Sequence, residues 1–512
     1  MHIFLYGPSG SGKSTVGKLL AKSLNLPFLD LDTEIERTSG QLIQQTISMQ
    51  GEHVFRDLET KVLKIITSNT ESIIALGGGA LLRDENRRLV HTLGQVVFLE
   101  VDLSTLISRL ANDENKRPLL AGKLEPSLQS LLDSRQEHYD SFPLRVDASR
   151  NPDQAAWEIQ VLIGRYHLRS MPPAYDVLVQ EGGLESIGDL LKQRGLSGPI
   201  LVVSDSNVAP LYLEDVLNSL RACGFAASKL VIPAGEAHKN IDTVSSIWLG
   251  CLAADLDRKS TLVALGGGVV GDLAGFAAAT FMRGLNWVAV PTTLLAMVDA
   301  SMGGKTGFDL PEGKNLVGVF HPPRFVLADP EVLDTLPERE LRAGLAEVVK
   351  HGIIADPDLF NLCSQGWETI KAHLPEVVRR GMAVKVKIIE EDPFEQGIRA
   401  ALNFGHTVGH AIELVSQFNL LHGEAVAIGM VVETNLAERL SIAEKGLAAT
   451  LQETLSKLRL PVDIPNNLPQ AEITDTMRSD KKKSAGIIRF ALPEKIGIVR
   501  VGIEIENLES VL

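Results

Sequence analysis

The sequence contains little cysteine and no long apolar run. Only 3 of its 512 residues are cysteines (Cys223, Cys251 and Cys363), and no two of them form a CxxC pair. This usage excludes a disulfide framework and is typical of a reducing compartment. No stretch reaches the 18 consecutive apolar residues of a transmembrane helix. The N-terminal residues MHIFLYGPSG lack the basic start and long apolar core of a signal peptide, so we expect a cytoplasmic protein.

Positive charge is also in deficit. The chain has 64 acidic and 50 basic residues, which gives a net charge of −14. This balance disfavours a general nucleic-acid binder or a binder of acidic membranes, because the phosphate groups would be repelled. Phosphorylated small molecules are still compatible, since they need only a local basic pocket. At 512 residues the chain is too long for one hydrophobic core, so several domains are expected.

Short β-rich runs alternate with helical patterns through much of the chain. Residues 2–6 (HIFLY) and 95–101 (QVVFLEV) read as buried strands, and KSTVGKLLAKSL reads as an amphipathic helix. Such alternation predicts α/β domains with parallel sheets. A Pro-containing linker interrupts it once, and from about residue 331 helical periodicity replaces the β-rich runs. The expected parts are an α/β domain (1–165), a linker (166–175), a Rossmann-like α/β part (176–330) and a mainly helical part (331–512).

Residues 7–14, GPSGSGKS, fit the phosphate-loop pattern G-x4-G-K-[ST]. The motif follows a predicted strand and opens a predicted helix, which is the context that phosphate binding requires and that a simple glycine-rich turn does not. The glycines let backbone N–H groups face an anion at the helix N-terminus. Lys13 would reach the β- and γ-phosphates of ATP, and Ser14 would bind Mg²⁺. The expected ATP contacts are Gly10, Ser11, Gly12, Lys13, Ser14 and Thr15.

Several charged residues outside this loop could bind the phosphate acceptor. Taken singly, each could be a solvated surface charge. Together they supply a carboxylate for an acceptor hydroxyl, arginines for an anionic acceptor, and an arginine on a polar loop that would offset the charge of the transferring group. They are Asp30, Asp32, Arg56, Arg117 and Arg135, together with the glycine run 77–79.

The first 165 residues or so resemble shikimate kinase. The motifs that carry the resemblance are GPSGSGKST, FLDLDTEIE, the FR of GEHVFRDLE, LGGGA and RPLLAG. The resemblance implies shikimate-binding residues Asp32, Arg56, Gly78 and Arg135. It implies catalytic residues Asp32, Lys13 and Arg117. Arg117 would contact ATP from a lid, Asp30 would help to hold Mg²⁺ through water, and Arg109 would flank the adenine.

The second half contains a second glycine-rich turn. LVALGGGVVGDLAGF reads as a strand, a turn and a helix of small residues. GGGVVGD is not GxGxxG, so by itself it indicates either a pyrophosphate-binding turn or a close-packed turn. Polar residues also follow other apolar strands in this half, and open α/β sheets bind ligands at that edge.

Three histidines form a cluster in the helical part. His406 and His410 lie four residues apart on one predicted helix, and His422 follows shortly after. A helical pair with this spacing could bind zinc or could be structural. His422 and nearby carboxylates favour a metal site. HExxH is absent because position 407 is Thr, which disfavours a zincin-type peptidase.

Residues from about 172 onward resemble 3-dehydroquinate synthase. The matching motifs are PAGEAHK, LGGGVVGDLAGF, PTTLLAMVDASMGGKTG, GLAEVVKHG, RAALNFGHTVGHAIE and LHGEAVAIGM. The resemblance implies a catalytic Zn²⁺ (or Co²⁺) bound by Glu347, His406 and His422. His410 would then lie beside the metal or the substrate without binding the metal.

The same resemblance implies further site residues. Those for NAD are Asp205, Asn207, Glu236, Lys239, Gly268, Val269, Val270, Gly271, Asp272, Thr292, Thr293, Lys305, Lys314 and Thr335. Those for the substrate are Arg283, Asn315, Lys350, Lys385, Arg399 and Asn403. The catalytic residues would be Lys305, His410 and Glu395. The chain departs from the usual DGE pattern at Ala234, and KKK at 481–483 leaves the reactive lysine of that tail ambiguous.

Together the two resemblances imply a bifunctional enzyme of the shikimate pathway. One half would phosphorylate shikimate, and the other would convert 3-deoxy-D-arabino-heptulosonate 7-phosphate to 3-dehydroquinate and phosphate. A homodimer through the second half is expected, because such synthases are commonly dimers, and no nucleic-acid or membrane partner is expected.

Two alternatives are open. One is another NAD- and metal-dependent enzyme of this superfamily, such as a polyol dehydrogenase or a sugar-phosphate cyclase with a different product. The other is a regulatory nucleotide-binding protein without catalysis.

Overall fold

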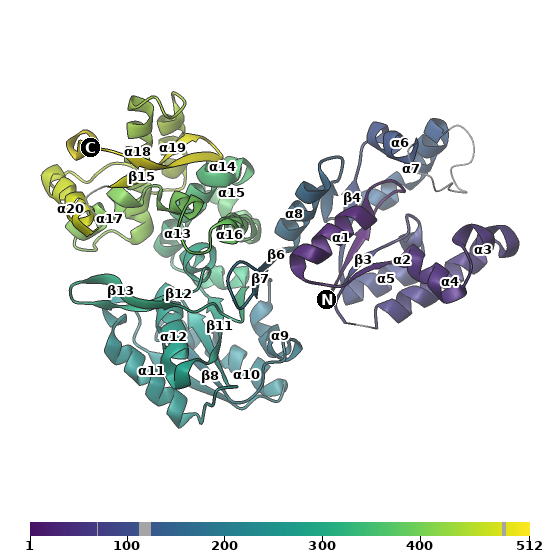
Figure 1. Ribbon diagram of the computed structural model, residues 1–512, viewed down its shortest axis with the longest axis horizontal. Helices are drawn as coiled ribbons and strands as arrows, with labels where there is room; N and C mark the ends of the chain where they lie inside the picture. The colour runs from purple at the N-terminus through teal and green to yellow at the C-terminus, as the bar shows by residue number, and fades with distance from the viewer. Residues whose placement is uncertain (69, 112–123, 484–487) are drawn as a thin grey trace. The chain divides into compact units, whose positions relative to one another are not determined.

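The chain folds into two compact units, Met1–His167 and Leu168–Leu512 (Figure 1). The structure is a computed structural model that describes residues 1–68, 70–111, 124–483 and 488–512, with the side chains of residues 479–483 outside the described part. Both units contain a parallel sheet, so the expected α/β fold class is confirmed.

The first unit is built on a sheet of five strands in the order β2-β3-β1-β4-β5, with every neighbouring pair parallel. Its strands are β1 (His2–Tyr6), β2 (Phe28–Asp30), β3 (Ile73–Ala75), β4 (Gly94–Glu100) and β5 (Arg145–Asp147). Its helices are α1 (Lys13–Leu24), α2 (Leu31–Ser39), α3 (Ile43–Gln50), α4 (Glu52–Ile66), α5 (Asp84–Leu93), α6 (Leu103–Ala111), α7 (Leu124–Asp140) and α8 (Pro152–Ile163).

Strand β1 is buried on both faces, which explains its continuous apolar run. Successive side chains of a strand point to opposite faces of the sheet. Ile3 and Leu5 therefore pack into the core under α1 and α8, whereas Phe4 and Tyr6 pack into the core that contains residues of α2, α4, α5 and α7. This three-layer arrangement holds the end of β1, and the phosphate loop that follows it, between two packed cores.

The second unit is built on a sheet whose strands run in the order β7-β14-β11-β10-β8-β9. These strands are β7 (Tyr175–Val179), β8 (Ile200–Asp205), β9 (Ala227–Ile232), β10 (Thr261–Gly266), β11 (Asn286–Pro291) and β14 (Phe325–Ala328). The helices of this α/β part are α9 (Ile187–Gln193), α10 (Glu214–Ala222), α11 (Ile241–Ala253) and α12 (Gly268–Thr280). The boundary between the two units falls within the short strand β6 (Arg165–Leu168). Strand β6 occupies the start of the segment that was expected to be a linker.

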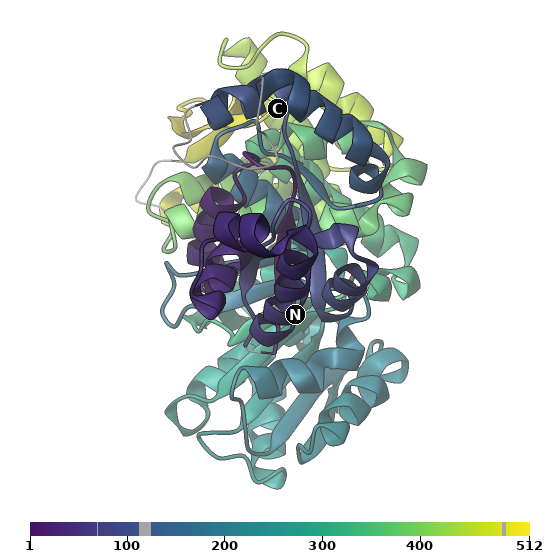
Figure 2. The same cartoon turned by 90° about the vertical axis from the view of Figure 1, so that its right-hand side faces the viewer.

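A hairpin and a helical part complete the second unit, and both views show the helical part (green to yellow) as a region separate from the sheet (teal) (Figures 1 and 2). The hairpin is β12 (Lys305–Leu310) and β13 (Gly313–Phe320). The helices are α13 (Glu338–Ala355), α14 (Pro357–Ser364), α15 (Trp367–Ala372), α16 (Leu374–Glu391), α17 (His406–Val415), α18 (His422–Arg439), α19 (Leu447–Lys457) and α20 (Gln470–Lys483). A second hairpin follows, formed by β15 (Arg489–Lys495) and β16 (Ile498–Glu504).

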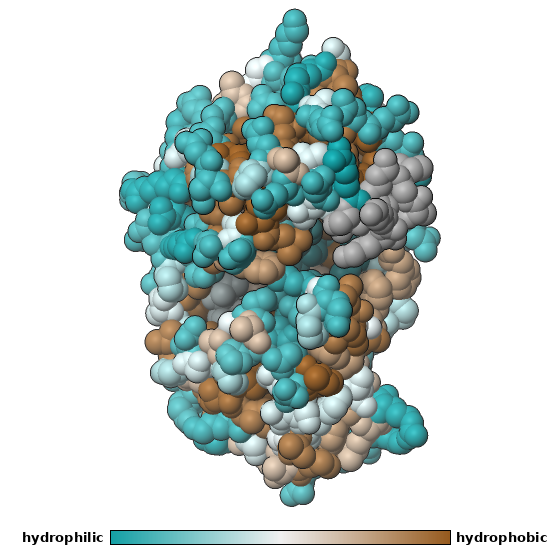
Figure 3. Space-filling view, turned by 90° about the vertical axis from the view of Figure 1, so that its left-hand side faces the viewer, coloured by the Kyte–Doolittle hydropathy of each residue, from teal (hydrophilic) through white to brown (hydrophobic). Residues whose placement is uncertain are grey.

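The surface carries mixed polarity. On the face drawn in Figure 3, apolar residues gather in several small groups that polar residues separate. Among the described residues, none of the helices combines the length and the apolar character that a membrane span needs.

Candidate active sites

The phosphate loop forms the first candidate site. It connects the end of β1 to the start of α1, and Gly10 and Gly12 adopt positive φ angles of 84° and 88°. Glycine adopts this backbone conformation without steric cost, which lets the loop wrap around an anion. The loop lines a cavity of ≈ 540 Å³. This volume lies in the range of about 300–1,000 Å³ that is typical of small-molecule sites.

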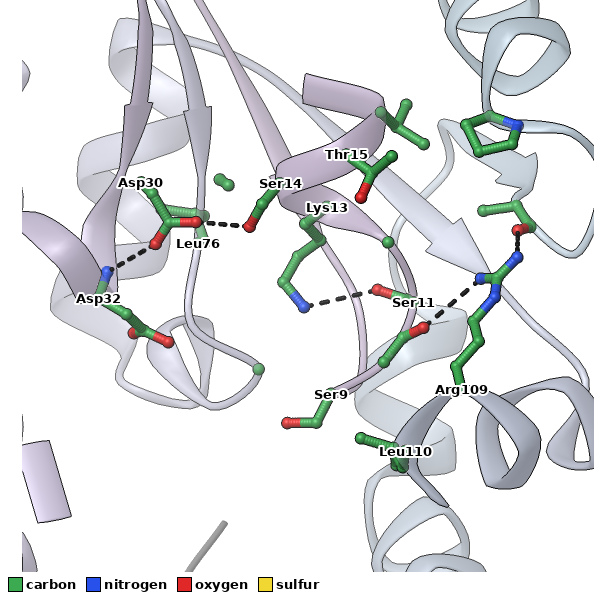
Figure 4. A pocket seen from close by; sticks show the side chains of 17 residues that line it. Ser9, Ser11, Lys13, Ser14, Thr15, Asp30, Asp32, Leu76, Arg109 and Leu110 are labelled. Carbon is green, nitrogen blue, oxygen red and sulfur yellow. Dashed lines mark hydrogen bonds between the residues drawn. The ribbon is translucent and has the colours of Figure 1, made fainter. Parts of the chain in front are cut away.

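The side chains expected to bind phosphate and Mg²⁺ face this cavity (Figure 4). Lys13 Nζ donates hydrogen bonds to the carbonyl oxygens of Gly7 and Pro8, both at 2.9 Å. Ser14 Oγ donates to Asp30 Oδ2 at 2.5 Å, so the hydroxyl expected to bind the ion lies against the carboxylate expected to support it. Ser11 and Thr15 line the same cavity. The arrangement is suited to a nucleotide phosphate with a divalent cation.

The glycine run 77–79 lies between the phosphate loop and the residues expected to bind the acceptor. A Cβ added to Gly77 would lie 3.1 Å from Asp32 Oδ1, and one added to Gly79 would lie 2.6 Å from the Arg56 guanidinium. One added to Gly78 would lie 3.3 Å from the Gly7 carbonyl oxygen. Arg135 donates from a guanidinium nitrogen to the Gly78 carbonyl at 3.0 Å. The structure thus brings Asp32, Arg56, Gly78 and Arg135 together at the mouth of the phosphate loop.

A buried glutamate holds Arg56 in place. Glu59 is fully buried, and Arg56 donates to both of its carboxylate oxygens at 3.2 and 2.9 Å. Burial raises the pKa of Glu59, although the positive charge of Arg56 works against this rise. Sequence reasoning missed Glu59, which lies one helical turn after Arg56 on α4.

Two arginines were expected near the nucleotide. Arg109 lines the cavity and donates to the carbonyl oxygens of Ala148 at 2.8 Å and Gly10 at 3.5 Å (Figure 4). Arg117, the expected lid arginine, lies outside the described residues.

In the second unit, the residues expected to bind NAD follow the carboxyl ends of adjacent strands. Asp205 ends β8, Gly268 follows β10 and Thr292 follows β11, and these three strands are neighbours in the sheet. Thr335 follows the next strand, β14, and its hydroxyl lies 2.6 Å from that of Tyr212. Open parallel sheets bind ligands at this edge. Gly268, Val269, Val270, Gly271 and Asp272 form the first turns of α12, Asn207 follows β8, and Thr293 follows Thr292.

A buried lysine connects this edge to the β12–β13 hairpin. Lys239 Nζ lies 2.7 Å from Asp272 Oδ2 and donates to Asn315 Oδ1 at 2.6 Å. Burial raises the pKa of Asp272 to about 6, although Lys239 opposes the shift. Lys314 reaches from the same hairpin to Glu413 at 2.9 Å and to Glu236 at 3.7 Å.

The three expected metal ligands converge from three helices. Glu347 lies on α13, His406 begins α17 and His422 begins α18. One ligand atom from each of the three residues lies within 4.8 Å of the others. His406 Nε2 lies 3.6 Å, and His422 Nε2 3.8 Å, from Glu347 Oε1. That oxygen is buried and has no hydrogen-bond partner among the described residues, so these donors fit a zinc ion.

Both imidazole rings are oriented by a contact at the other ring nitrogen. His406 Nδ1 lies 3.2 Å from the carbonyl oxygen of Phe404, and His422 Nδ1 lies 3.2 Å from Glu413 Oε2. When Nδ1 carries the proton, it donates a hydrogen bond to the carbonyl or carboxylate oxygen, which leaves the Nε2 lone pair free for a metal. Burial lowers the pKa of His406 well below its usual value, and Lys350 adds to the effect. Burial also lowers the pKa of His422, but Glu413 and Glu347 more than offset it.

Two other clusters of potential ligands suit a metal less well. In the cluster of His410, Glu413 and His422, the Glu413 carboxylate already contacts Lys314. In the cluster of Asp299, Glu347 and His351, the Asp299 carboxylate already contacts Lys385. His410 is exposed, with its ring 5.1 Å from that of His406, which agrees with a place beside the metal.

Two of the lysines expected on the substrate side lie beside this cluster. Lys350 contacts Glu347, and Lys385 donates to the carbonyl oxygen of Asp299 at 2.7 Å. Lys305 lies 2.5 Å from Glu395. The buried Arg399 and the exposed Asn403 belong to the short helix η9 (Ile398–Asn403), which leads into α17.

Arg283 differs from Lys350 and Lys385. It is exposed at the end of η6 (Phe281–Arg283), and no described contact joins it to the metal-ligand cluster.

Two carboxylates that sequence reasoning missed support the cluster. Glu413 bridges His422 and Lys314, and it ends the motif GHAIE one helical turn after His410. Glu433 is fully buried on α18 and accepts the N–H groups of Gly405 at 2.7 Å and Val408 at 3.1 Å, at the N-terminus of α17. In the sequence, only the helical spacing of Glu413 from His410 could have indicated a role for Glu413.

Comparison with known proteins assigns both units. The family model described as shikimate kinase matches residues 9–163. The models described as 3-dehydroquinate synthase N-terminal and C-terminal match residues 229–343 and 344–483. A 3-dehydroquinate synthase from Picosynechococcus sp. is 45% identical over 335 residues, which are 64% of this chain and 92% of that protein.

Solved structures are also similar to each unit. ValA, a 2-epi-5-epi-valiolone synthase from Streptomyces hygroscopicus subsp. jinggangensis solved with NAD⁺ and Zn²⁺, is 30% identical with a TM-score of 0.60, and the match covers 66% of this chain and 94% of that one. A shikimate kinase from Acinetobacter baumannii, solved with shikimate, is 37% identical with a TM-score of 0.31, and the match covers 32% of this chain and 92% of that one. The family models and the curated synthase together show a bifunctional enzyme that joins a shikimate kinase unit to a second unit belonging to the 3-dehydroquinate synthase family.

Proposed function

We propose that the first unit transfers the γ-phosphoryl group of ATP to the 3-hydroxyl of shikimate, giving 3-phosphoshikimate and ADP. Asp32, beside the glycine run, would accept a hydrogen bond from the acceptor hydroxyl. Arg56 and Arg135 supply positive charge for the carboxylate of the acceptor. Lys13 and a Mg²⁺ ion at Ser14 would stabilise the charge of the transferring group, so catalysis here is mainly positioning and electrostatics.

We propose that the second unit converts 3-deoxy-D-arabino-heptulosonate 7-phosphate to 3-dehydroquinate and phosphate. The observation that carries this proposal is Glu347 Oε1, a buried acceptor that has no hydrogen bond in the described part of the chain and faces two imidazole Nε2 atoms. Three protein ligands leave a coordination position open, as a catalytic zinc requires. When bound, zinc would supply a Lewis acid for a substrate hydroxyl, and NAD⁺ would supply a hydride acceptor that returns the hydride, without net oxidation.

The chain's own residues would bind and orient this substrate. Lys350 and Lys385 carry buried positive charge beside the metal cluster, and Arg399 is 2% exposed in the helix that precedes His406. Such buried cations suit a phosphate and a carboxylate. Lys305 and Glu395 form an ion pair that joins the β12–β13 hairpin to the loop before η9. We propose that this pair holds or moves a proton on the bound substrate.

A sugar-phosphate cyclase with another product is the second candidate for this unit. ValA, a 2-epi-5-epi-valiolone synthase, is similar in fold but 30% identical to this chain, whereas the 3-dehydroquinate synthase from Picosynechococcus sp. is 45% identical. The difference favours 3-dehydroquinate as the product.

Product analysis tests the proposal for the second unit. The purified full chain receives the heptulosonate phosphate with catalytic NAD⁺ and zinc, and NMR follows the products while phosphate release is measured. We expect 3-dehydroquinate and phosphate, no net NADH, and loss of turnover with a chelator. A different cyclitol, or accumulating NADH, would contradict the assignment.

Two parts of the proposal need separate measurements. ADP release that depends on shikimate tests the first unit. Light scattering tests the homodimer that we propose through the second unit.

A further inference from the structure

The carbonyl group of Gly78 accepts hydrogen bonds from three side chains. Arg135 donates to it at 3.0 Å, Tyr6 Oη at 3.3 Å and Tyr139 Oη at 3.5 Å. Tyr6 is fully buried at the end of β1, and Tyr139 is 4% exposed on α7. A backbone carbonyl usually needs one partner, so three convergent donors indicate that the orientation of this peptide group matters.

The amide on the other side of the same peptide bond has no such partner among the residues that the structure describes. Gly79 is buried, and no hydrogen bond from its N–H is found in the part of the chain that the structure describes. A buried N–H without a partner is costly unless water or a ligand accepts it. A Cβ at Gly79 would lie 2.6 Å from the Arg56 guanidinium, so this glycine lies beside a cation expected to bind the acceptor.

The two ends of the peptide group are geometrically coupled. In a planar trans peptide the C=O and the following N–H point in opposite directions. When Tyr6, Tyr139 and Arg135 hold the Gly78 carbonyl on the side of the core, the Gly79 N–H must point away from that core. The contact with the carbonyl also fixes one end of the Arg135 guanidinium.

A second contact of Tyr6 determines where its single proton goes. Its hydroxyl also lies 3.1 Å from His138 Nε2 on α7. If His138 donates from Nε2 to the Tyr6 oxygen, the Tyr6 proton is directed to Gly78. With that tautomer, His138 and Tyr6 form a chain of donors that ends on the glycine run. Sequence reasoning gave neither residue a role.

We propose that Tyr6 is a positioning residue for the phosphate acceptor of the first unit. It acts through the Gly78–Gly79 peptide group and Arg135, which together present an N–H donor and a guanidinium to an anionic acceptor. This inference rests on the proposed identity of that acceptor as shikimate. It concerns binding of the acceptor, because Gly79 lies beside Arg56 and the Gly78 carbonyl holds Arg135, the two cations expected to bind the acceptor.

The test is the variant Tyr6→Phe in the full chain, which removes one hydroxyl and keeps the ring in the core. We expect KM for shikimate to rise about 3- to 10-fold, the loss typical of one hydrogen bond. KM for ATP and kcat should stay within about 2-fold of the wild type. Isothermal titration with shikimate alone should show the same loss of affinity. Tyr139→Phe removes the longer contact to the same carbonyl and should give a smaller rise.

Two controls separate positioning from a structural effect. Tyr166→Phe removes a hydroxyl from another buried tyrosine of the first unit and should leave both KM values unchanged. The activity of the second unit serves as an internal standard for the concentration of folded chain. An unchanged KM for shikimate in Tyr6→Phe, or an equal rise for ATP, would overturn the inference. Failure of the wild type to phosphorylate shikimate would overturn the proposed acceptor as well.

Discussion

At the scale of single residues, Glu413 links the metal cluster to the hairpin. Its carboxylate contacts His422 Nδ1 at 3.2 Å and Lys314 Nζ at 2.9 Å. A carboxylate in this place fixes the orientation of the ligand imidazole and increases its basicity. Burial raises the pKa of Glu413, but the contacts with His422 and Lys314 bring it down to about 2. The group is therefore ionised at neutral pH.

The variant Glu413→Gln should weaken zinc binding. Loss of such a carboxylate typically lowers metal affinity roughly 10- to 100-fold. Competition with a chromophoric chelator measures the affinity, and the visible spectrum of the Co²⁺-loaded protein reports the geometry of the ligands. Glu453→Gln, which breaks an exposed ion pair on α19, is the matched control. Equal affinities for the two variants would show that Glu413 does not support His422.

Glu433 makes the stability of the second unit sensitive to pH. Burial raises the pKa of this carboxyl to about 8, although the amides of Gly405 and Val408 donate to it. This folded-state pKa lies above the value of about 4.3 for a glutamate in the unfolded chain. The contribution of Glu433 to folding stability is therefore complete below the unfolded pKa. The contribution is lost as pH rises through about 8.

The variant Glu433→Gln tests the direction of this pH dependence. The melting temperature of the wild type should fall between pH 6 and pH 9. That of the variant should fall less, because the amide of Gln does not ionise. The difference between the two proteins isolates Glu433 from other titrating groups. Parallel pH profiles for the two proteins would contradict the raised pKa.

At the scale of elements, glycines on α18 allow three helices to approach each other. A Cβ added to Gly423 would lie 1.9 Å from the Ala343 carbonyl oxygen on α13. One added to Gly429 would lie 2.1 Å from the Gly405 carbonyl oxygen at the start of α17. These close approaches bring Glu347, His406 and His422 within reach of one ion. The metal site therefore depends on backbone contacts as well as on its ligands.

The variant Gly423→Ala should push α13 and α18 apart. Overpacking of this kind typically costs about 1–3 kcal/mol of folding stability, and it should also lower zinc affinity. Thermal melting and zinc titration of the same sample check both effects. Gly446→Ala meets no atom within 4 Å, but its φ of +91° makes an added Cβ strained. This control should lose stability without losing zinc affinity, and equal zinc loss in both variants would contradict the argument.

The regular elements were largely predictable from local sequence. The expected strand 2–6 matches β1, and KSTVGKLLAKSL matches α1, because both have a clear apolar pattern and sharp ends. The hairpin β12–β13 was missed because neither strand alternates between buried and exposed residues: three consecutive residues of β12 are buried, whereas β13 is mostly exposed. The hairpin β15–β16 was missed for another reason: the rest of the chain after residue 331 has strong helical periodicity, which dominated the prediction for this part.

At the scale of the whole molecule, the two sites belong to separately packed units. The phosphate loop lies in Met1–His167 and the metal cluster in Leu168–Leu512. Each site is lined by residues of its own unit, and shikimate phosphorylation does not use the product of the synthase directly. The two activities should therefore be separable by mutation.

Two single variants test this separation. Lys13→Ala should lower kinase activity at least about 100-fold, because it deletes a charge that stabilises the transferring phosphoryl group. It should leave synthase activity within about 2-fold. His422→Ala should do the reverse, because it deletes a metal ligand. Assays of both activities on each purified variant decide the matter, and loss of both in a folded variant would show that the sites are coupled.

The sequence by itself determined the α/β class, the phosphate loop and the identity of the two families. These features depend on residues that are close together along the chain, where spacing fixes geometry. Tertiary structure alone decided that Glu347 Oε1 faces two Nε2 atoms, that Glu413 and Glu433 support the histidines, and that Tyr6 reaches Gly78. Such contacts join residues far apart in sequence. They depend on how closely helices and strands pack, which no local pattern encodes.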